Sequence, residues 1–185
     1  MRISLIGPMA AGKSTVGQLL ADRLHWPFYD TDTLIETARG KSISQIFAEE
    51  GEDFFRNLET IFLKKLLTQP ESMVIATGGG IVKKLENRSL LQTHSQVVFL
   101  DLPVTEQLQR TAGDTSRPIL MVENKVERLE ALRQERLPLY QEIASLTLQT
   151  HQAAPEELAH ILEGHLKISK NNCQPKVEMS HFYQS

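Results

Sequence analysis

The sequence predicts an α/β protein in which helices cover both faces of a parallel β-sheet. Two short segments, Met73–Ala76 and Val97–Leu100, are apolar at every position, as expected for central strands that are buried on both sides. Helical patterns separate these strands, and such alternation is typical of parallel sheets. A third apolar run, Ile3–Ile6, is followed by a glycine-containing loop and then by a helical pattern. The strand-end loops of such a sheet lie along one rim, where ligands bind.

The elements of the first half follow from apolar spacing and from residues that begin or end helices. Apolar residues between positions 16 and 24 recur at helical spacing and predict the first helix. Residues 27–29 are expected to form a second strand that ends near Asp30. Ser42 and Gln45 form a capping-box pattern, which predicts a short helix through residue 47. A long amphipathic helix is expected over residues 54–66, ended by Pro70.

The second half continues the alternation. Each of the two fully apolar strands is followed by a helical segment. The spacing of Leu129, Leu132 and Arg136 predicts a helix that ends before Pro138. Residues 146–150 alternate between apolar and polar and are expected to form the last strand. A closing helix is expected from Pro155 to residue 166, because proline is favoured at the first helical position.

A chain of 185 residues is expected to bury a single hydrophobic core, and we expect one domain over residues 1–168. Within it, residues 112–124 have no regular pattern and are long enough to form a mobile lid. Residues 169–185 are polar and are expected to form a disordered C-terminal tail.

Charge and cysteine content exclude several classes of protein. The chain has 20 Lys and Arg against 23 Asp and Glu, a formal net charge of -3, which provides no basic field for a nucleic-acid backbone or an anionic membrane. One cysteine allows neither an internal disulfide nor a cysteine-based zinc site, which favours the cytoplasm. No uncharged apolar run approaches the roughly 20 residues of a membrane-spanning helix. We therefore expect a cytoplasmic protein with small-molecule ligands and neither nucleic-acid nor membrane partners. We also expect a monomer.

The loop after the first predicted strand matches a phosphate-binding motif. Its sequence GPMAAGKS fits G-x-x-x-x-G-K-[ST] and lies between a strand and a helix, as the motif requires. The glycines let backbone N–H groups turn toward phosphate oxygens, and the helix N-terminus adds partial positive charge. Lys13 can neutralise the β- and γ-phosphates, and Ser14 can offer its hydroxyl to Mg²⁺. The residues expected to bind a nucleotide here are Gly7, Met9, Ala10, Ala11, Gly12, Lys13, Ser14 and Thr15.

Asp30 and Asp32 stand at the end of the second predicted strand. If Thr31 continues the extended backbone, both carboxylates face the same side and reach the nucleotide rim. One would then lie near Mg²⁺ and the other near an acceptor hydroxyl. The alternative is a solvated turn or a cap for the next helix, which is the more usual role of an isolated Asp-x-Asp.

Two further groups favour an anionic ligand. Arg56 and Glu59 are three residues apart on the long predicted helix, so Glu59 can orient the guanidinium; the alternative is a surface ion pair worth under about 1 kcal/mol. Gly78–Gly80 directly follow an apolar strand, and backbone without side chains can approach a ligand closely, or can simply form a flexible turn. Taken singly, Arg117 and Arg136 would be solvated charges.

Together these segments resemble the shikimate kinase family over roughly residues 2–166. The resemblance depends on several segments that occur in the family's order. They are the loop Gly7–Thr15, Asp30-Thr31-Asp32, Ile46-Phe47 with Glu50-Gly51-Glu52, Phe55-Arg56 with Glu59, Ala76-Thr77-Gly78-Gly79-Gly80, Arg117-Pro118-Ile119-Leu120 and Arg136 with Pro138-Leu139-Tyr140.

The resemblance implies a fold and an activity. The implied fold has three layers, with a central five-stranded parallel sheet of the P-loop type, like that of nucleoside monophosphate kinases, and a mobile lid. The implied activity is transfer of the γ-phosphoryl group of ATP to the 3-hydroxyl of shikimate. The product is shikimate 3-phosphate, on the route to chorismate and the aromatic amino acids. ATP and Mg²⁺ are the implied cofactors.

The resemblance also implies roles by position. Lys13 and Arg117 would meet the transferred phosphate, and Asp32 would hold the shikimate hydroxyls and is a candidate proton acceptor. Ser14 and Asp30 would hold Mg²⁺, the latter through water. The implied shikimate-binding residues are Asp32, Arg56, Gly78, Gly79, Gly80 and Arg136. The implied neighbours of adenine are Arg110 and Pro155, and Arg117 would also contact the nucleotide.

Two other functions share the phosphate loop. Another small-molecule kinase, such as a gluconate kinase, would not need the set formed by Arg56, Gly78–Gly80 and Arg136. A catalytically inert nucleotide-binding module would bind ATP and use the tail for a partner. The first alternative is separated by a substrate panel, the second by the absence of shikimate-dependent ADP release.

Overall fold

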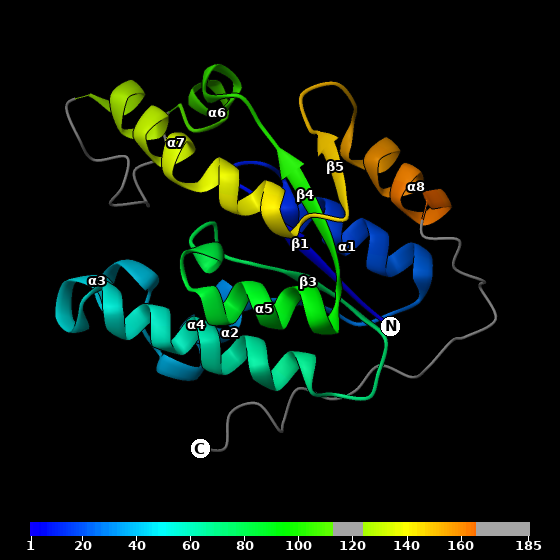
Figure 1. Cartoon of the computed structure of the whole chain (residues 1–185), viewed down its shortest axis with the longest axis horizontal. Coiled ribbons are helices and arrows are strands. Elements are labelled where there is room, and N and C mark those ends of the chain that lie inside the picture. Colours follow the sequence, from blue (N-terminus) through cyan, green and yellow to red (C-terminus); the bar gives the residue numbers. More distant parts are fainter. Residues whose placement is uncertain (113–123, 166–185) are drawn as a thin grey trace.

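A computed structural model describes residues 1–112 and 124–165 of the chain. Its centre is a parallel sheet of five strands in the order β2-β3-β1-β4-β5 (Figure 1). The strands are β1 (Arg2–Ile6), β2 (Phe28–Asp30), β3 (Met73–Ala76), β4 (Gln96–Asp101) and β5 (Leu146–Gln149). The predicted five-stranded parallel sheet is confirmed. None of the helices within the described residues is long and apolar enough to cross a membrane.

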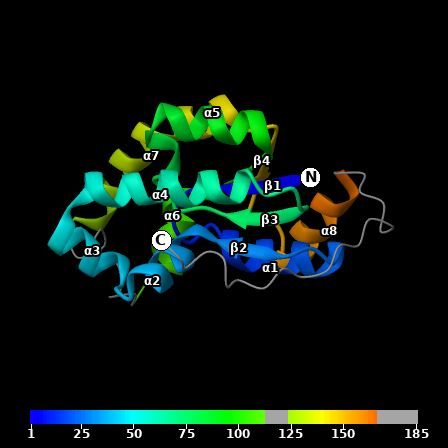
Figure 2. The same cartoon turned by 90° about the horizontal axis from the view of Figure 1, so that it is seen from below.

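Helices cover both faces of the sheet, which makes three layers (Figure 2). One face carries α1 (Lys13–Leu24) and α8 (Pro155–His165); the other carries α4 (Glu52–Leu67), α5 (Leu85–His94) and α7 (Lys125–Ile143). Alternate strand residues face opposite layers. In β1, Ile3 and Leu5 pack in the cluster of α1 and α8, whereas Ile6 packs in the cluster of α4, α5 and α7.

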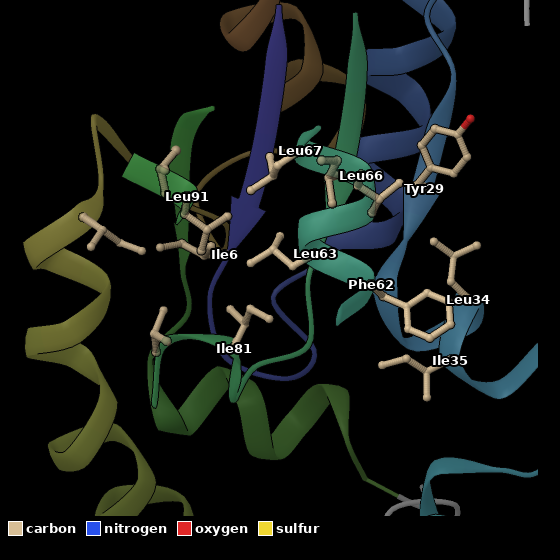
Figure 3. Packing of buried hydrophobic residues seen from close by; sticks show 14 of the residues in the cluster. Ile6, Tyr29, Leu34, Ile35, Phe62, Leu63, Leu66, Leu67, Ile81 and Leu91 are labelled. Carbon is tan, nitrogen blue, oxygen red and sulfur yellow. The ribbon is translucent and has the colours of Figure 1, made fainter. Parts of the chain in front are cut away.

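The second cluster is the larger of the two. Leu63, Leu66 and Leu67 of α4 lie against the sheet beside Ile6 (Figure 3). Every one of these side chains is at most 2% exposed. The apolar strands are therefore buried from both sides, as their sequences predict, and their carboxyl ends are free to hold loops at one rim.

Shorter helices complete the chain: α2 (Thr31–Arg39), α3 (Ile43–Glu50), the 3-10 turn η1 (Ile81–Lys83) and α6 (Val104–Arg110). The capping box at the start of α3 is confirmed, because Ser42 Oγ accepts from the Gln45 N–H at 3.2 Å and Gln45 Oε1 accepts from the Ser42 N–H at 2.8 Å. Helix α2 is not predicted by the apolar pattern.

Three boundaries differ from the predictions. Helix α7 does not end before Pro138 but runs through it to Ile143. Proline removes one backbone hydrogen bond, yet the buried side chains of Tyr140 and Ile143 hold the continuation against the core. Helix α4 ends at Leu67, three residues before Pro70, and β5 ends one residue short of Thr150.

The predicted lid and tail fall almost wholly outside the described residues. Of the lid, residues 112–124, only the two ends are described: Ala112 lies in a turn after α6, and Asn124 caps α7 by accepting from the Glu127 N–H at 3.3 Å. The predicted tail, residues 169–185, lies outside them entirely.

The packing of α1 on the sheet predicts the effect of one added methyl group. Gly17 is buried in α1, where a Cβ would stand 2.6 Å from the Phe28 ring and 3.1 Å from Leu5. Gly17→Ala should therefore lower the free energy of unfolding by about 1–3 kcal/mol through overpacking. Gly164→Ala is the control, since a Cβ in this helix would meet nothing within 4 Å and alanine is the better helix former. Denaturant unfolding of both variants would measure this; equal stability of the two would contradict the packing.

Candidate active site

The phosphate-binding loop connects the central strand β1 to α1. At Gly7 the backbone has φ of 143° and a side chain would collide with the Leu100 carbonyl, so the close approach of the loop to β4 requires glycine. Gly12, with φ of 82°, precedes α1, and no side chain caps that helix. Lys13 Nζ donates to the carbonyls of Gly7 at 2.9 Å and Pro8 at 2.7 Å. The ammonium group therefore lies across the loop beside the helix N-terminus.

Arg110 joins this loop to the end of β5. Its guanidinium donates to the carbonyl of Ala10 at 3.2 Å and to the carbonyl of Thr150 at 2.7 Å. Thr150 directly follows β5, and Pro155 begins α8 five residues later. The two residues expected beside adenine thus flank the turn between β5 and α8, next to the phosphate loop.

Asp30 has two roles that are divided between its oxygens. Oδ1 accepts from the backbone N–H groups of Asp32 at 3.0 Å and Thr33 at 3.4 Å, which makes Asp30 the N-cap of α2. Oδ2 accepts from Ser14 Oγ at 2.5 Å. Thr31 does not continue the extended backbone. The alternative, a cap for the next helix, is confirmed, because Asp30 caps α2 and α2 starts at Thr31. Ser14 and Asp30 nevertheless lie together.

Asp32 reaches the rim from the first turn of α2. A Cβ on Gly78 would lie 2.6 Å from Asp32 Oδ1 and 2.7 Å from Glu59 Oε1, so both carboxylates border this glycine. Neither of these two oxygens has a hydrogen-bond partner among the described residues, although both are buried. Burial, then the charges of Asp30 and Glu59, raise the pKa of Asp32 from 3.8 to about 7.

Arg56 is held by two carboxylates of its own helix. Its Nη1 donates to Glu59 Oε2 at 2.6 Å, and its Nε and Nη2 each donate to Glu52 Oε1 at 3.1 Å. Glu59 is fully buried and the Arg56 side chain is 12% exposed. The guanidinium lies so close to Gly80 that a Cβ there would collide with it. Glu59 therefore orients Arg56, as their spacing predicts. Because Gly80 has no side chain, it leaves space for the Arg56 guanidinium.

Gly79 is the contact point for α7. Its carbonyl accepts from the Tyr140 hydroxyl at 2.5 Å and from Arg136 Nη1 at 3.4 Å. The Tyr140 ring stacks on Phe99 of β4, with 5.0 Å between centroids. Arg136 Nε is buried and has no hydrogen-bond partner within the described residues.

The structure thus brings together most of the residues singled out in the sequence. Asp32, Arg56 and Arg136 meet around Gly78–Gly80, next to the loop that holds Lys13. A Cβ on Gly79 would come within 3.4 Å of the Gly7 carbonyl, so the two glycine segments are neighbours. Arg117 lies outside the described residues.

Sequence reasoning did not assign roles to two residues of the site. Glu52 is four residues before Arg56, a spacing that signals an ion pair on a helix. Tyr140 belongs to a quoted motif, but its bond to Gly79 joins residues 61 positions apart and follows only from the packing of α7.

Comparisons with known proteins agree with this geometry. A family model described as shikimate kinase matches residues 9–166. The chain belongs to the shikimate kinase family. A shikimate kinase from Vibrio parahaemolyticus is 46% identical over 158 residues, which span 85% of this chain and 91% of the relative. One from Acinetobacter baylyi is 49% identical over 157 residues, spanning 85% of this chain and 87% of the relative.

Solved structures place the fold in the same family. A shikimate kinase from Acinetobacter baumannii, solved in complex with shikimate, has a TM-score of 0.85 at 45% identity. The match spans 90% of this chain and 93% of the chain of that structure. A deoxyadenosine kinase from M. mycoides with bound dATP has a TM-score of 0.60 at 13% identity. This match spans 91% of our chain and 100% of the chain of that structure. The second likeness shows the fold alone, and this fold is the predicted P-loop kinase fold.

The raised pKa of Asp32 predicts a pH-dependent stability. The folded protein holds a proton on this carboxyl up to about pH 7, whereas the unfolded chain releases it near pH 4. The free energy of unfolding should therefore fall as pH rises from about 4 to about 7. Asp32→Asn has no carboxyl to ionise and so avoids this fall in the free energy of unfolding. The variant should have a higher melting temperature than the parent at pH 8 and the same melting temperature at pH 4.

Thermal unfolding at several pH values measures the difference. Asp53→Asn is the control, because Asp53 is an exposed residue of α4. A pH profile for Asp32→Asn that is parallel to that of the parent would show that Asp32 has an ordinary pKa.

Proposed function

We propose that the chain transfers the γ-phosphoryl group of ATP to the 3-hydroxyl of shikimate, giving shikimate 3-phosphate. The observation that carries this proposal is the meeting of Arg56, Arg136 and Gly78–Gly80 beside the phosphate loop. A phosphate loop alone would suit any nucleotide-dependent enzyme. Two arginines set next to it add a site for a small anion, and the relative from Acinetobacter baumannii was solved with shikimate.

The nucleotide is bound by the loop between β1 and α1 and by the turn after β5. Backbone N–H groups of Gly7 and residues 9–15 would face the β- and γ-phosphates, and the N-terminus of α1 adds partial positive charge. Lys13 exchanges its carbonyl partners for phosphate oxygens. Arg110 and Pro155 border the adenine.

Ser14 and Asp30 fit a magnesium ion. A hydroxyl and a carboxylate oxygen lie 2.5 Å apart at the mouth of the loop, and such hard oxygen donors suit Mg²⁺, which keeps several of its waters. When bound, Mg²⁺ supplies positive charge to the β- and γ-phosphate oxygens. The side chains of Ser14 and Asp30 would hold it, the latter through water.

Shikimate is a small carboxylic acid with three hydroxyls and little apolar surface, so charge and hydrogen bonds must supply its affinity. Arg56 and Arg136 bind its carboxylate; each charge-assisted bond contributes about 1.5–3 kcal/mol. Asp32 accepts from the hydroxyls through its buried, unpartnered Oδ1. With a pKa of about 7, Asp32 suits a group that accepts the proton of the attacking hydroxyl near neutral pH.

Transfer also requires cations around the phosphate and exclusion of water. Lys13 supplies one charge to the γ-phosphate, and Arg117, which lies outside the described residues, is proposed from the family resemblance to supply another. The same resemblance supports a lid over residues 112–124 that closes over both substrates, within one domain of residues 1–168. We also propose that the protein is a monomer, and its single cysteine favours the cytoplasm.

The activity is tested by ADP formation in the presence of ATP and Mg²⁺, with shikimate or gluconate as acceptor. We expect ADP release that depends on shikimate and not on gluconate. Lys13→Ala should reduce kcat by about a hundredfold or more, because one donor to the developing charge is lost. Lys64→Ala, on an exposed lysine of α4, is the control. If the protein binds ATP but releases ADP at the same rate with and without shikimate, the proposal is wrong.

Gly80 predicts an effect on shikimate alone. In Gly80→Ala the new methyl group collides with the Arg56 guanidinium and displaces it from the rim. We expect the KM for shikimate to rise by about tenfold, since misplacement of ~1 Å costs up to about a hundredfold, while the KM for ATP is unchanged. Gly164→Ala, remote and uncrowded, should leave both values alone. An unaltered KM for shikimate in Gly80→Ala would remove Arg56 from the binding site.

A further inference from the structure

One face of α7 presents three polar side chains to the carboxyl ends of the strands. Arg133, Arg136 and Tyr140 are spaced by three and four residues, which places them on the same side of a helix. Arg136 Nη1 and the Tyr140 hydroxyl both donate to the Gly79 carbonyl. Arg133 instead reaches Asp101, the last residue of β4. Arg136 is therefore flanked on its own helix by an anchor on each side.

The anchor formed by Arg133 is a two-pronged ion pair. Arg133 Nη1 donates to Asp101 Oδ1 at 2.7 Å, and Nη2 donates to Oδ2 at 3.2 Å. Nη1 also donates to the Leu102 carbonyl at 3.2 Å. The two side chains are 9% and 28% exposed for Asp101 and Arg133 respectively. Paired bonds of this kind fix the guanidinium in direction as well as in place, so Arg133 fixes the rotation of α7 about its axis.

Asp101 is itself held by the neighbouring strand. Oδ2 accepts from Gln149 Nε2 of β5 at 3.1 Å, and the Asp101 carbonyl accepts from the Thr150 N–H at 2.9 Å. Burial acts to raise the pKa of Asp101, but the hydrogen bonds from Arg133 and Gln149 outweigh it and leave the pKa below its ordinary value. The carboxylate is thus charged at neutral pH and rigidly placed.

The anchor matters because Pro138, two residues after Arg136, weakens the continuity of α7 without ending the helix. Pro138 has no N–H to offer the Gln134 carbonyl, so one backbone bond between the two halves of α7 is missing. The half beyond Pro138 is held by the buried Tyr140 and Ile143. The contacts of the half before it include a small cluster with Leu129 and Leu132 and the ion pair of Arg133.

We propose that Asp101 and Arg133 are positioning residues for shikimate binding, which set the orientation of α7 so that Arg136 faces Gly79. This inference rests on the proposed role of Arg136 in holding the shikimate carboxylate. Neither Asp101 nor Arg133 needs to contact the substrate. They affect the substrate through Arg136, which lies three positions after Arg133 on α7.

The first test replaces the guanidinium by an apolar chain of similar length. Arg133→Met should raise the dissociation constant of shikimate by about tenfold, because Arg136 is no longer held in place, with the KM for ATP unchanged. Arg133→Lys keeps one charged contact and should recover part of the loss. Arg128→Met is the control: Arg128 is exposed on the same helix, and its side chain forms no hydrogen bond or ion pair within the described residues.

The second test shows whether the pair acts through Arg136. Asp101→Asn should weaken shikimate binding as Arg133→Met does, and the double variant should be no worse than either single one. In an Arg136→Lys background, Arg133→Met should add no further loss. Shikimate binding by calorimetry measures each constant, and thermal unfolding confirms that the variants are folded at the temperature used.

Three results would overturn the proposal. Unchanged shikimate affinity in a less stable Arg133→Met would make the pair purely structural. A raised KM for ATP alone would assign Arg133 to the nucleotide. Losses that add fully in the Arg136→Lys background would show a route that bypasses Arg136. If Arg136→Lys itself binds shikimate normally, the proposed role of Arg136 fails, a result that is separate from these three.

Discussion

The site depends on the close approach of side chains to the backbone of Gly78–Gly80. Asp32 and Glu59 border the first glycine, Tyr140 and Arg136 bond to the carbonyl of the second, and the Arg56 guanidinium lies against the third. These groups come from α2, α4 and α7, which meet at this segment. Because a Cβ at the first or third position would displace a charged group, the absence of side chains here is what allows three helices to share one small volume.

This crowding places several charged groups in a site from which solvent is largely excluded. The carboxyls of Asp32 and Glu59 and the guanidinium of Arg56 are largely buried, and burial of charge costs free energy unless partners offset it. Arg56 has two such partners in Glu52 and Glu59. At Asp32, burial and the charges of Asp30 and Glu59 outweigh those of Lys13 and Arg56 and raise the pKa of the carboxyl to about 7. A folded protein retains such an unbalanced carboxyl where a ligand or a proton is to be received.

Much of the fold could be predicted because the decisive signals are local. The apolar strands, the glycine loop and the capping box each lie within a few residues, and the structure has all three. The start of α2 stayed open between an extended backbone and a helix cap, because it depends on one side chain, that of Asp30, turning back on the next backbone N–H groups. The length of α7 was missed because burial of Tyr140 outweighs the proline rule. Contacts such as Arg133 with Asp101 join residues 32 positions apart, and no spacing rule relates a helix to a strand at that distance.

Asp30 uses one oxygen to cap α2 and turns the other toward Ser14. Its carboxylate is consequently immobilised as the chain folds, before any cation arrives. The entropy lost in fixing that side chain belongs to the folding equilibrium rather than to the binding equilibrium. Under the proposed function, the Mg²⁺ that arrives with each nucleotide would meet the same donor geometry from one turnover to the next.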